Sequence, residues 1–208
     1  MHIELTEMLR CPEPHQEEFL VLSTGEMLGR MVRFGILGCP VCHHEYPITK
    51  GIADFTGSVK RETGNVVARE PTFPVSRVPS PDPPTLQALL ELSGPGGYVV
   101  LLGGAARRAV GLAGLMAGIH FVGINAPPEV EELPVLSLLL SSGKIPLRHA
   151  VARGVVVGAD LAASPWLVEA HRILLCGRRF VVEHERPELP IGLEKLAGAE
   201  GLWVGEKK

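Results

Sequence analysis

The sequence lacks an excess of either charge and is poor in aromatic residues. Its 208 residues carry 20 Lys and Arg against 23 Asp and Glu, a net charge of −3. Such a chain has no overall basic footprint, so we expect no general binding of nucleic acid. Aromatic residues make up only 5% of the chain, but 46% of it is apolar. That content is enough for the core of one ordinary domain plus a small module.

Long apolar runs and export signals are lacking as well. The longest apolar stretch, 109–124, contains four glycines and is shorter than the roughly 20 residues that a membrane span needs. It therefore predicts a protein core, and we expect no membrane partner. The N-terminus carries Glu4 and Glu7 and has no basic start followed by an apolar run, so it predicts no signal peptide. We expect a cytoplasmic protein.

Cysteine is also scarce, and its placement indicates a metal site. There are four cysteines, and three of them lie within the first 42 residues. In a chain without an export signal this clustering favours metal ligation over disulfides. Cys39 and Cys42, in the sequence CPVC, have the spacing of one metal-binding knuckle. Cys11 belongs to a second knuckle that has no second cysteine.

The missing fourth ligand has three candidates. Pro14 occupies the position of the expected cysteine, and His15 follows it directly. His15 is the favoured substitute, ahead of His43 and His44, and the alternative is a metal-free module held by its small core with leftover thiols. We predict that Zn²⁺ is bound by a Cys₃His set: Cys11, His15, Cys39 and Cys42.

Two alternating segments, 18–22 and 31–37, lie between the two knuckles. Alternation of this kind predicts strands, and two knuckles separated by a β-hairpin form a zinc ribbon. In so short a segment the metal replaces a hydrophobic core that cannot be built. We therefore assign residues 1–56 to a zinc-ribbon-like β module.

Three sequences in this module carry a resemblance: LRCP at 9–12, CPVC at 39–42 and YPITKGIADF at 46–55. They resemble the small zinc-ribbon family that binds and activates tRNA, rRNA and release-factor methyltransferases. The resemblance implies a ribbon that docks on proteins, because four protein ligands leave the metal no open position for catalysis. The implied partner is a protein, either a methyltransferase or a translation factor.

Residues 57–84 show no periodicity and are rich in proline, with six prolines inside 71–84. Such a composition predicts an extended spacer of the polyproline type. We assign it as the linker between two domains.

The remaining residues, 85–208, begin with an apolar run, GGYVVLLGGAARR at 96–108, that has no alternation. Such a run predicts a strand covered on both faces, followed by a glycine turn into a helix. Further along the chain, expected strands and helices alternate, which predicts a doubly wound, Rossmann-like parallel sheet. The expected strands are 98–102, 120–125, 135–140, 154–159, 179–183 and 202–204; the expected helices are 85–92, 106–116, a short one from Pro127, one with Ser164 as N-cap, and 191–197.

Four segments resemble class I S-adenosylmethionine-dependent methyltransferases: GGYVVLLGGAA at 96–106, FVGINAPPEV at 121–130, IPLRHAVARGVVV at 145–157 and EAHRILLCGRRFVVEHERPE at 169–188. Their order and spacing agree with that family over the whole domain. The resemblance implies the methyltransferase fold, with S-adenosylmethionine bound beyond the first two strands.

The side chains that hold the cofactor in that family are missing here. The acids expected at the ends of the first three strands are replaced by Leu101, Asn125 and Ser141, and only the first glycine of the loop is kept. Each lost charge-assisted hydrogen bond is worth about 1.5–3 kcal/mol, so losing several weakens binding by powers of ten. We expect a vestigial cofactor site whose remaining positions are Gly103, Gly104 and Asn125.

These observations favour a non-catalytic binding or scaffold protein, whose ribbon docks on its own pseudo-methyltransferase domain or on another methyltransferase. The alternative is an active S-adenosylmethionine-dependent methyltransferase with an atypical site, for which Asp160 is a weak catalytic candidate. A third hypothesis is an anionic ligand held by Arg107 and Arg108. On the favoured hypothesis the cofactor is Zn²⁺ and S-adenosylmethionine is not bound.

Overall fold

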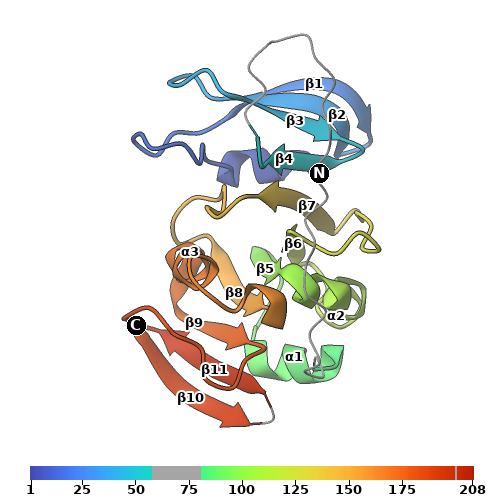
Figure 1. Ribbon diagram of the computed structural model, residues 1–208. Coiled ribbons are helices and arrows are strands. Elements are labelled where there is room, and N and C mark those ends of the chain that lie inside the picture. Colours follow the sequence, from blue (N-terminus) through green and yellow to red (C-terminus); the bar gives the residue numbers. More distant parts are fainter. Residues whose placement is uncertain (58–80, 200) are drawn as a thin grey trace.

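The computed structural model describes residues 1–57, 81–199 and 201–208, and its strands join into one mixed sheet (Figure 1). The sheet has eleven strands in the order β1-β2-β3-β4-β7-β6-β5-β8-β9-β11-β10. Most of the linker predicted at 57–84 lies outside the described residues. The strands are β1 Val21–Leu28, β2 Met31–Gly38, β3 Glu45–Thr49, β4 Ile52–Phe55, β5 Tyr98–Leu102, β6 His120–Ile124, β7 Leu136–Ser141, β8 Ala152–Val157, β9 Leu174–Val182, β10 Leu193–Ala199 and β11 Leu202–Lys207. The α-helices are α1 Pro83–Leu90, α2 Ala109–Leu115 and α3 Trp166–Ile173, and the 3₁₀ helices are η1 Ile3–Met8, η2 Gly103–Arg108 and η3 Ala159–Leu161.

The centre of the sheet is parallel and confirms the predicted α/β class. Strands β7, β6, β5, β8 and β9 pair in parallel, in the 3-2-1-4-5 order of doubly wound folds. Strand β5 lies in the middle and is buried on both faces, as its unbroken apolar run predicts. Val99 and Leu101 face one core cluster with α1 and α2, whereas Val100 and Leu102 face the other with α3. Helices therefore cover both faces (Figure 1).

The C-terminal end of the sheet differs from the prediction. The helix predicted at 191–197 is wrong, because this segment forms strand β10, which pairs with β11 in antiparallel orientation. Leu193, Leu196 and Ala197 have helical spacing, but the ladder to β11 overrides this weak local preference. Strand β11 in turn pairs antiparallel with β9.

Other predicted helices also differ in the structure. The chain from Pro127 forms a turn rather than a short helix. Helix α3 begins at Trp166, and its first turn receives no capping bond from a side chain, so Ser164 is not its N-cap. Helix α1 begins at Pro83, two residues before the predicted start, because the Asp82 carboxylate accepts a hydrogen bond from the Thr85 N–H.

The N-terminal region, residues 1–56, continues the same sheet. Strands β1 to β4 are antiparallel to one another, and β4 then pairs in parallel with β7, from Ile52 beside Leu138 to Phe55 beside Ser141. A second backbone contact lies nearby, where the N–H of Arg10 donates to the Pro146 carbonyl at 3.0 Å. The N-terminal region is thus docked on the α/β region, residues 85–208, of the same chain.

This junction is apolar and well packed. One cluster of buried side chains contains residues of both regions, including Leu9 and Ile48 from the first and Ile124 and Leu147 from the second. Arg33 also forms an ion pair with Glu132 across the junction. Among the described residues, no helix is long and apolar enough to cross a membrane.

Candidate functional site

The four predicted metal ligands meet at one end of the β1–β2 hairpin. Cys11 follows η1 and is held by its N–H, which donates to the Glu18 carbonyl at 3.0 Å. After β2, at the same end of the hairpin, the His43 N–H donates to the Cys39 carbonyl at 3.0 Å, and His43 adopts a left-handed conformation with φ 58°. These turns bring both knuckles to the same place.

The ligand atoms of Cys11, His15, Cys39 and Cys42 all lie within 4.8 Å of one another. The Cys11 and Cys42 sulfurs are 3.6 Å apart, and His15 Nε2 lies 3.2 Å from Cys11 Sγ and 3.4 Å from Cys39 Sγ. Around a tetrahedral zinc with bonds of about 2.3 Å to sulfur and 2.0 Å to nitrogen, these edges are about 3.8 and 3.5 Å. The donor set and its spacing therefore fit zinc.

His15 is oriented for this role by its second ring nitrogen. His15 Nδ1 lies 2.6 Å from the Gln16 carbonyl oxygen. A proton on Nδ1 makes this contact and leaves Nε2, which points to the sulfurs, unprotonated and able to bind a metal. His44 instead lies 3.1 Å from a Glu13 carboxylate oxygen, and the cluster among the described residues includes neither His43 nor His44.

The surroundings shift the pKa values of the Cys11 and Cys39 thiols in opposite directions. Burial raises the pKa of the Cys11 thiol to about 12, although the Tyr46 hydroxyl lies 3.3 Å from its sulfur. Burial also acts on Cys39, but the N–H groups of Cys42 and Val41 outweigh it and lower the pKa of that thiol. Backbone N–H groups thus favour one thiolate, whereas Cys11 needs a neighbouring cation to become one.

The second predicted site lies where the strand order reverses, between β5 and β8. In doubly wound sheets this switch point is where ligands bind, beyond the carboxyl ends of the strands. Gly103, with φ 58°, turns the chain into η2, and Gly158 follows β8, its N–H donating to the Leu102 carbonyl at 3.0 Å. The backbone of the predicted glycine turn is therefore present.

The space over this turn is filled by Asp160. Its carboxylate accepts a hydrogen bond from the Gly104 N–H at 2.9 Å. A Cβ atom placed on Gly103 or on Gly158 would collide with the same carboxylate. Asp160 thus occupies the position of an anionic ligand, and the sequence did not reveal this role.

Asn125 and Ser141 form a closed pair at the ends of β6 and β7. The Asn125 side chain donates to the Ser141 carbonyl at 2.9 Å and accepts from the Ser141 N–H at 2.8 Å. Both residues are buried. One N–H of the Asn125 amide and its oxygen are therefore bonded inside the protein. Together with Asp160 in the turn, this arrangement does not fit an adenosine ligand as it stands.

The arginines after the turn are also engaged. Arg107 Nε donates to Glu129 at 2.6 Å and Arg108 Nε donates to the Pro81 carbonyl at 3.0 Å. Arg153 donates to the carbonyls of Ser93, Gly94, Pro95 and Gly96. The hypothesis of an anion held by Arg107 and Arg108 receives no support from these contacts.

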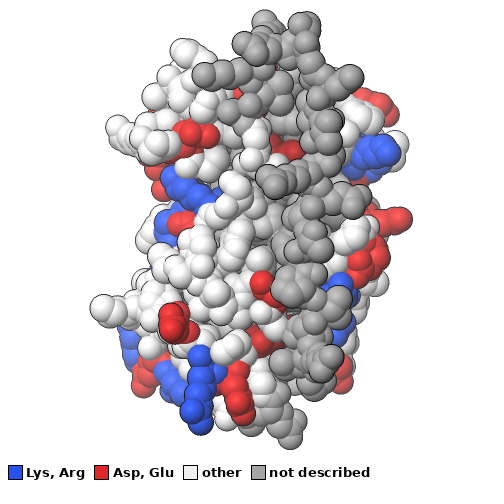
Figure 2. All heavy atoms as spheres, viewed as in Figure 1, with Lys and Arg blue, Asp and Glu red and all other residues white. Residues whose placement is uncertain are grey.

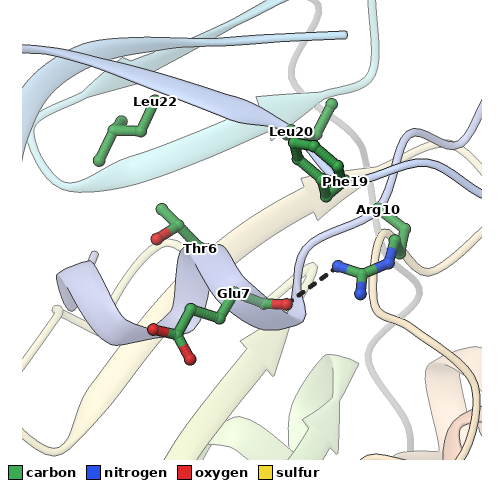
Figure 3. A pocket seen from close by; sticks show the side chains of 6 residues that line it. All are labelled: Thr6, Glu7, Arg10, Phe19, Leu20 and Leu22. Carbon is green, nitrogen blue, oxygen red and sulfur yellow. Dashed lines mark hydrogen bonds between the residues drawn. The ribbon is translucent and has the colours of Figure 1, made fainter. Parts of the chain in front are cut away.

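A hollow of about 390 Å³, which the sequence did not indicate, lies between η1 and β1 (Figure 3). Its lining is mixed, with Thr6, Glu7 and Arg10 on one side and Phe19, Leu20 and Leu22 on the other. Arg10 donates to the Glu7 carbonyl at 2.9 Å.

No protein-family profile matches the chain, and no curated protein sequence matches it either. Solved structures do show similarity. One is the complex of the Haloferax volcanii Trm112 methyltransferase activator with a candidate methyltransferase, at 24% identity over 47% of this chain and 50% of that chain, with a TM-score of 0.39.

The antibiotic-resistance methyltransferase Kmr matches at 15% identity over 62% of this chain and 95% of that chain, with a TM-score of 0.42. The geranyl diphosphate C-methyltransferase of Streptomyces coelicolor A3(2) matches at 14% identity over 48% and 41%, with a TM-score of 0.40. This chain therefore spans about half of the Haloferax volcanii chain and less than half of the Streptomyces one. The strand order and helix placement, rather than these partial overlaps, establish its α/β fold class.

Proposed function

We propose that this chain is a non-catalytic scaffold in which a zinc ribbon, residues 1–56, is built onto a pseudo-methyltransferase domain, residues 85–208. The ribbon adds four strands to the edge of the domain through the β4–β7 pairing. An activator-type ribbon and the domain on which it docks would then belong to one polypeptide. We further propose that the scaffold works in the cytoplasm and presents a surface to a protein partner, such as a methyltransferase or a translation factor.

The observation that carries this proposal is the Asp160 carboxylate on the glycine turn. A ligand that used the Gly104 N–H would have to displace it, at a cost of about 1.5–3 kcal/mol for a charge-assisted bond. Opening the Asn125–Ser141 pair would cost more, because both groups are buried. Each 1.4 kcal/mol weakens binding tenfold, so these two costs together remove useful affinity for S-adenosylmethionine.

In this proposal Cys11, His15, Cys39 and Cys42 hold a structural Zn²⁺. The ion neutralises the thiolates, among them Cys11, which burial would otherwise keep protonated, and it joins the two knuckles on either side of the β1–β2 hairpin. Four protein ligands leave it no open position for water or substrate. Its role is to fix the shape of the region that docks on β7.

The charges also agree with a protein partner. In the view of Figure 2, Lys and Arg side chains are interspersed with Asp and Glu, and no single sign covers that face. A binding surface for nucleic acid would instead gather positive charge.

An active methyltransferase with an atypical site is the second candidate. It is favoured by the intact switch point, where β5 ends in a left-handed Gly103 as in a ligand-binding turn. In that case Asp160 would have to move before the cofactor entered.

Titration calorimetry with S-adenosylmethionine on the zinc-loaded protein separates the two candidates. We expect no binding heat into the millimolar range. A micromolar dissociation constant would instead favour the enzyme. Elemental analysis for zinc on the same sample verifies the ribbon independently, with about one ion per chain expected.

A further inference from the structure

Tyr46 lies beside the cysteine cluster with its side chain inside the protein. It belongs to β3, where it pairs with Leu37 of β2, and it is only 1% exposed. Its hydroxyl oxygen lies 3.3 Å from Cys11 Sγ, within reach of a hydrogen bond to sulfur. The phenol ring thus contacts one of the predicted metal ligands through its only polar atom.

The direction of this hydrogen bond is fixed once a metal is bound. In the metal-free protein either group can donate. A cysteine that ligates zinc does so as the thiolate, which has no proton left to donate. The Tyr46 hydroxyl must then be the donor and Cys11 Sγ the acceptor. Hydrogen bonds to a charged acceptor are stronger than neutral ones, so metal binding and this contact favour each other.

The Cys11 thiolate needs such a donor because water cannot solvate it. Cys11 is only 2% exposed, and a buried charge is costly unless it is paired and hydrogen-bonded. The Cys39 sulfur receives backbone N–H groups of its own knuckle. From its knuckle Cys11 receives the N–H of Glu13. The Tyr46 hydroxyl adds a donor to Cys11 from a different part of the chain.

The packing of Tyr46 fixes this donor and connects it to the junction with the α/β region. Its ring centroid lies 4.7 Å from that of Phe55, which belongs to β4, the strand that pairs with β7. On the other side of the contact, Cys11 directly follows Arg10, whose N–H donates to the Pro146 carbonyl. The contact between Tyr46 and Cys11 therefore joins two segments that dock on the α/β region.

We propose that Tyr46 is a positioning residue of the zinc site, whose hydroxyl donates to the Cys11 thiolate and tightens binding of the ion. This inference rests on the zinc ribbon of the proposed function. Loss of a hydrogen-bond partner of a metal ligand typically weakens metal binding by about 10-fold to 100-fold. A tyrosine that only filled the core would leave the affinity for zinc unchanged when its hydroxyl is removed.

Tyr46→Phe tests the hydroxyl alone, because it keeps the ring. Competition between the full chain and a chromophoric chelator for Zn²⁺ measures the dissociation constant of the ion. We expect this constant to rise at least about tenfold in the variant. The second of the two tyrosines in the chain provides the matched control. Tyr98→Phe, in β5 and outside the cluster, should bind zinc as the wild type does.

Absorption of the Co²⁺-loaded protein shows whether the hydroxyl acts at the sulfur. The near-ultraviolet bands of a cobalt–thiolate site arise from charge transfer from sulfur to the metal. Loss of a hydrogen bond raises the energy of the sulfur lone pairs. We therefore expect these bands to move to longer wavelength in Tyr46→Phe and to stay in place in Tyr98→Phe.

Two results would overturn the role of Tyr46 and leave the proposed function standing. One is a Tyr46→Phe variant that binds zinc as tightly as the wild type. The other is weaker binding with unchanged cobalt bands, because the hydroxyl would then act through folding alone. A wild-type chain that took up neither metal would instead overturn the zinc ribbon itself, and the role of Tyr46 with it.

Discussion

The two candidate sites differ in how their polar groups find partners. At the cysteine cluster, three sulfurs and one imidazole nitrogen converge on a common centre. At the predicted cofactor site, beyond the ends of β5, β6 and β7, the Gly104 N–H and the two backbone groups of Ser141 bond to side chains of the same chain. In our proposal the first set holds a cation, whereas the polar groups of the second already bond to one another. In our proposal the fold has therefore kept the backbone of a binding site that its side chains now close.

The largest effect is expected from removing a metal ligand. Cys39→Ser should lower the melting temperature by more than about 10 °C, because the N-terminal region depends on binding energy that the ion supplies. Differential scanning calorimetry with elemental analysis measures both stability and zinc. Cys176→Ser is the matched control, because Cys176 is exposed and lies outside the cluster. If both variants and the wild type melted at the same temperature and contained no zinc, the cysteine cluster would not be a metal site. It would then no longer differ from the predicted cofactor site in this respect.

A pH titration tests the packing at the junction between the N-terminal region and the α/β region. Burial, followed by the neighbouring His2, lowers the pKa of His120 from 6.5 to about 4. The ring contacts the Ser137 hydroxyl at 3.0 Å, and its centroid lies 5.2 Å from that of His2. The unfolded chain binds this proton first as the pH falls, so stability is lost between pH 6.5 and about 4, by about 1.4 kcal/mol per pH unit.

Urea unfolding of the wild type and of His120→Asn at a series of pH values measures this loss. The variant should have a shallower slope over that range, because one titrating group is gone. If the free energy of unfolding of both proteins changed with pH to the same degree, His120 would not be buried at the junction.

The closed pair at β6 and β7 should also be costly to break. Asn125→Ala leaves the buried N–H and carbonyl of Ser141 without these partners, and we expect a loss of about 2–3 kcal/mol. Chemical denaturation measures it against Ser142→Ala, which is exposed and should stay within about 0.5 kcal/mol of the wild type. A variant as stable as this control would mean that the pair does not hold the site closed.

The smallest change in stability is expected for Asp160. Asp160→Ala removes one charge-assisted hydrogen bond at a partly exposed turn, for about 1.5 kcal/mol, and it opens the space over Gly103. Combined with Asn125→Asp, it should make binding of S-adenosylmethionine measurable by calorimetry. Glu129→Ala, which breaks only an exposed pair with Arg107, is the control and should not. If Glu129→Ala bound S-adenosylmethionine as tightly as the double variant, Asp160 would not be the group that blocks the site.

The strands of the parallel core could be predicted because their apolar residues lie next to one another in the sequence. Tyr98–Leu102 is an unbroken apolar run, and the structure has β5 with the same bounds. The second strand is one residue shorter than predicted and the third is shifted by one residue, whereas the fourth and fifth begin two and five residues before their predicted starts. The segment from Leu193 was wrongly predicted as a helix because its apolar residues have helical spacing. Its strand partner lies beyond a glycine turn, where Gly201 has φ 82°.

Features that depend on distant contacts were not predictable. The chain pattern suggested two modules, but it could not show that Ile52 would lie beside Leu138 and join them into one sheet. Asp160 looked like an ordinary loop acid, because only the fold brings it over Gly103. The proximity of the metal ligands was predictable, since Cys39 and Cys42 have knuckle spacing and His15 lies near Cys11 in the chain. Whether they bind zinc remains a prediction.

The most direct test of the central claim is an amide NMR titration of the zinc-loaded protein with S-adenosylmethionine. The account predicts that the signals of Gly104, Asn125 and Ser141 do not move at millimolar ligand, because their bonding groups already have partners within the chain. Saturating shifts of these three signals at micromolar ligand would contradict it.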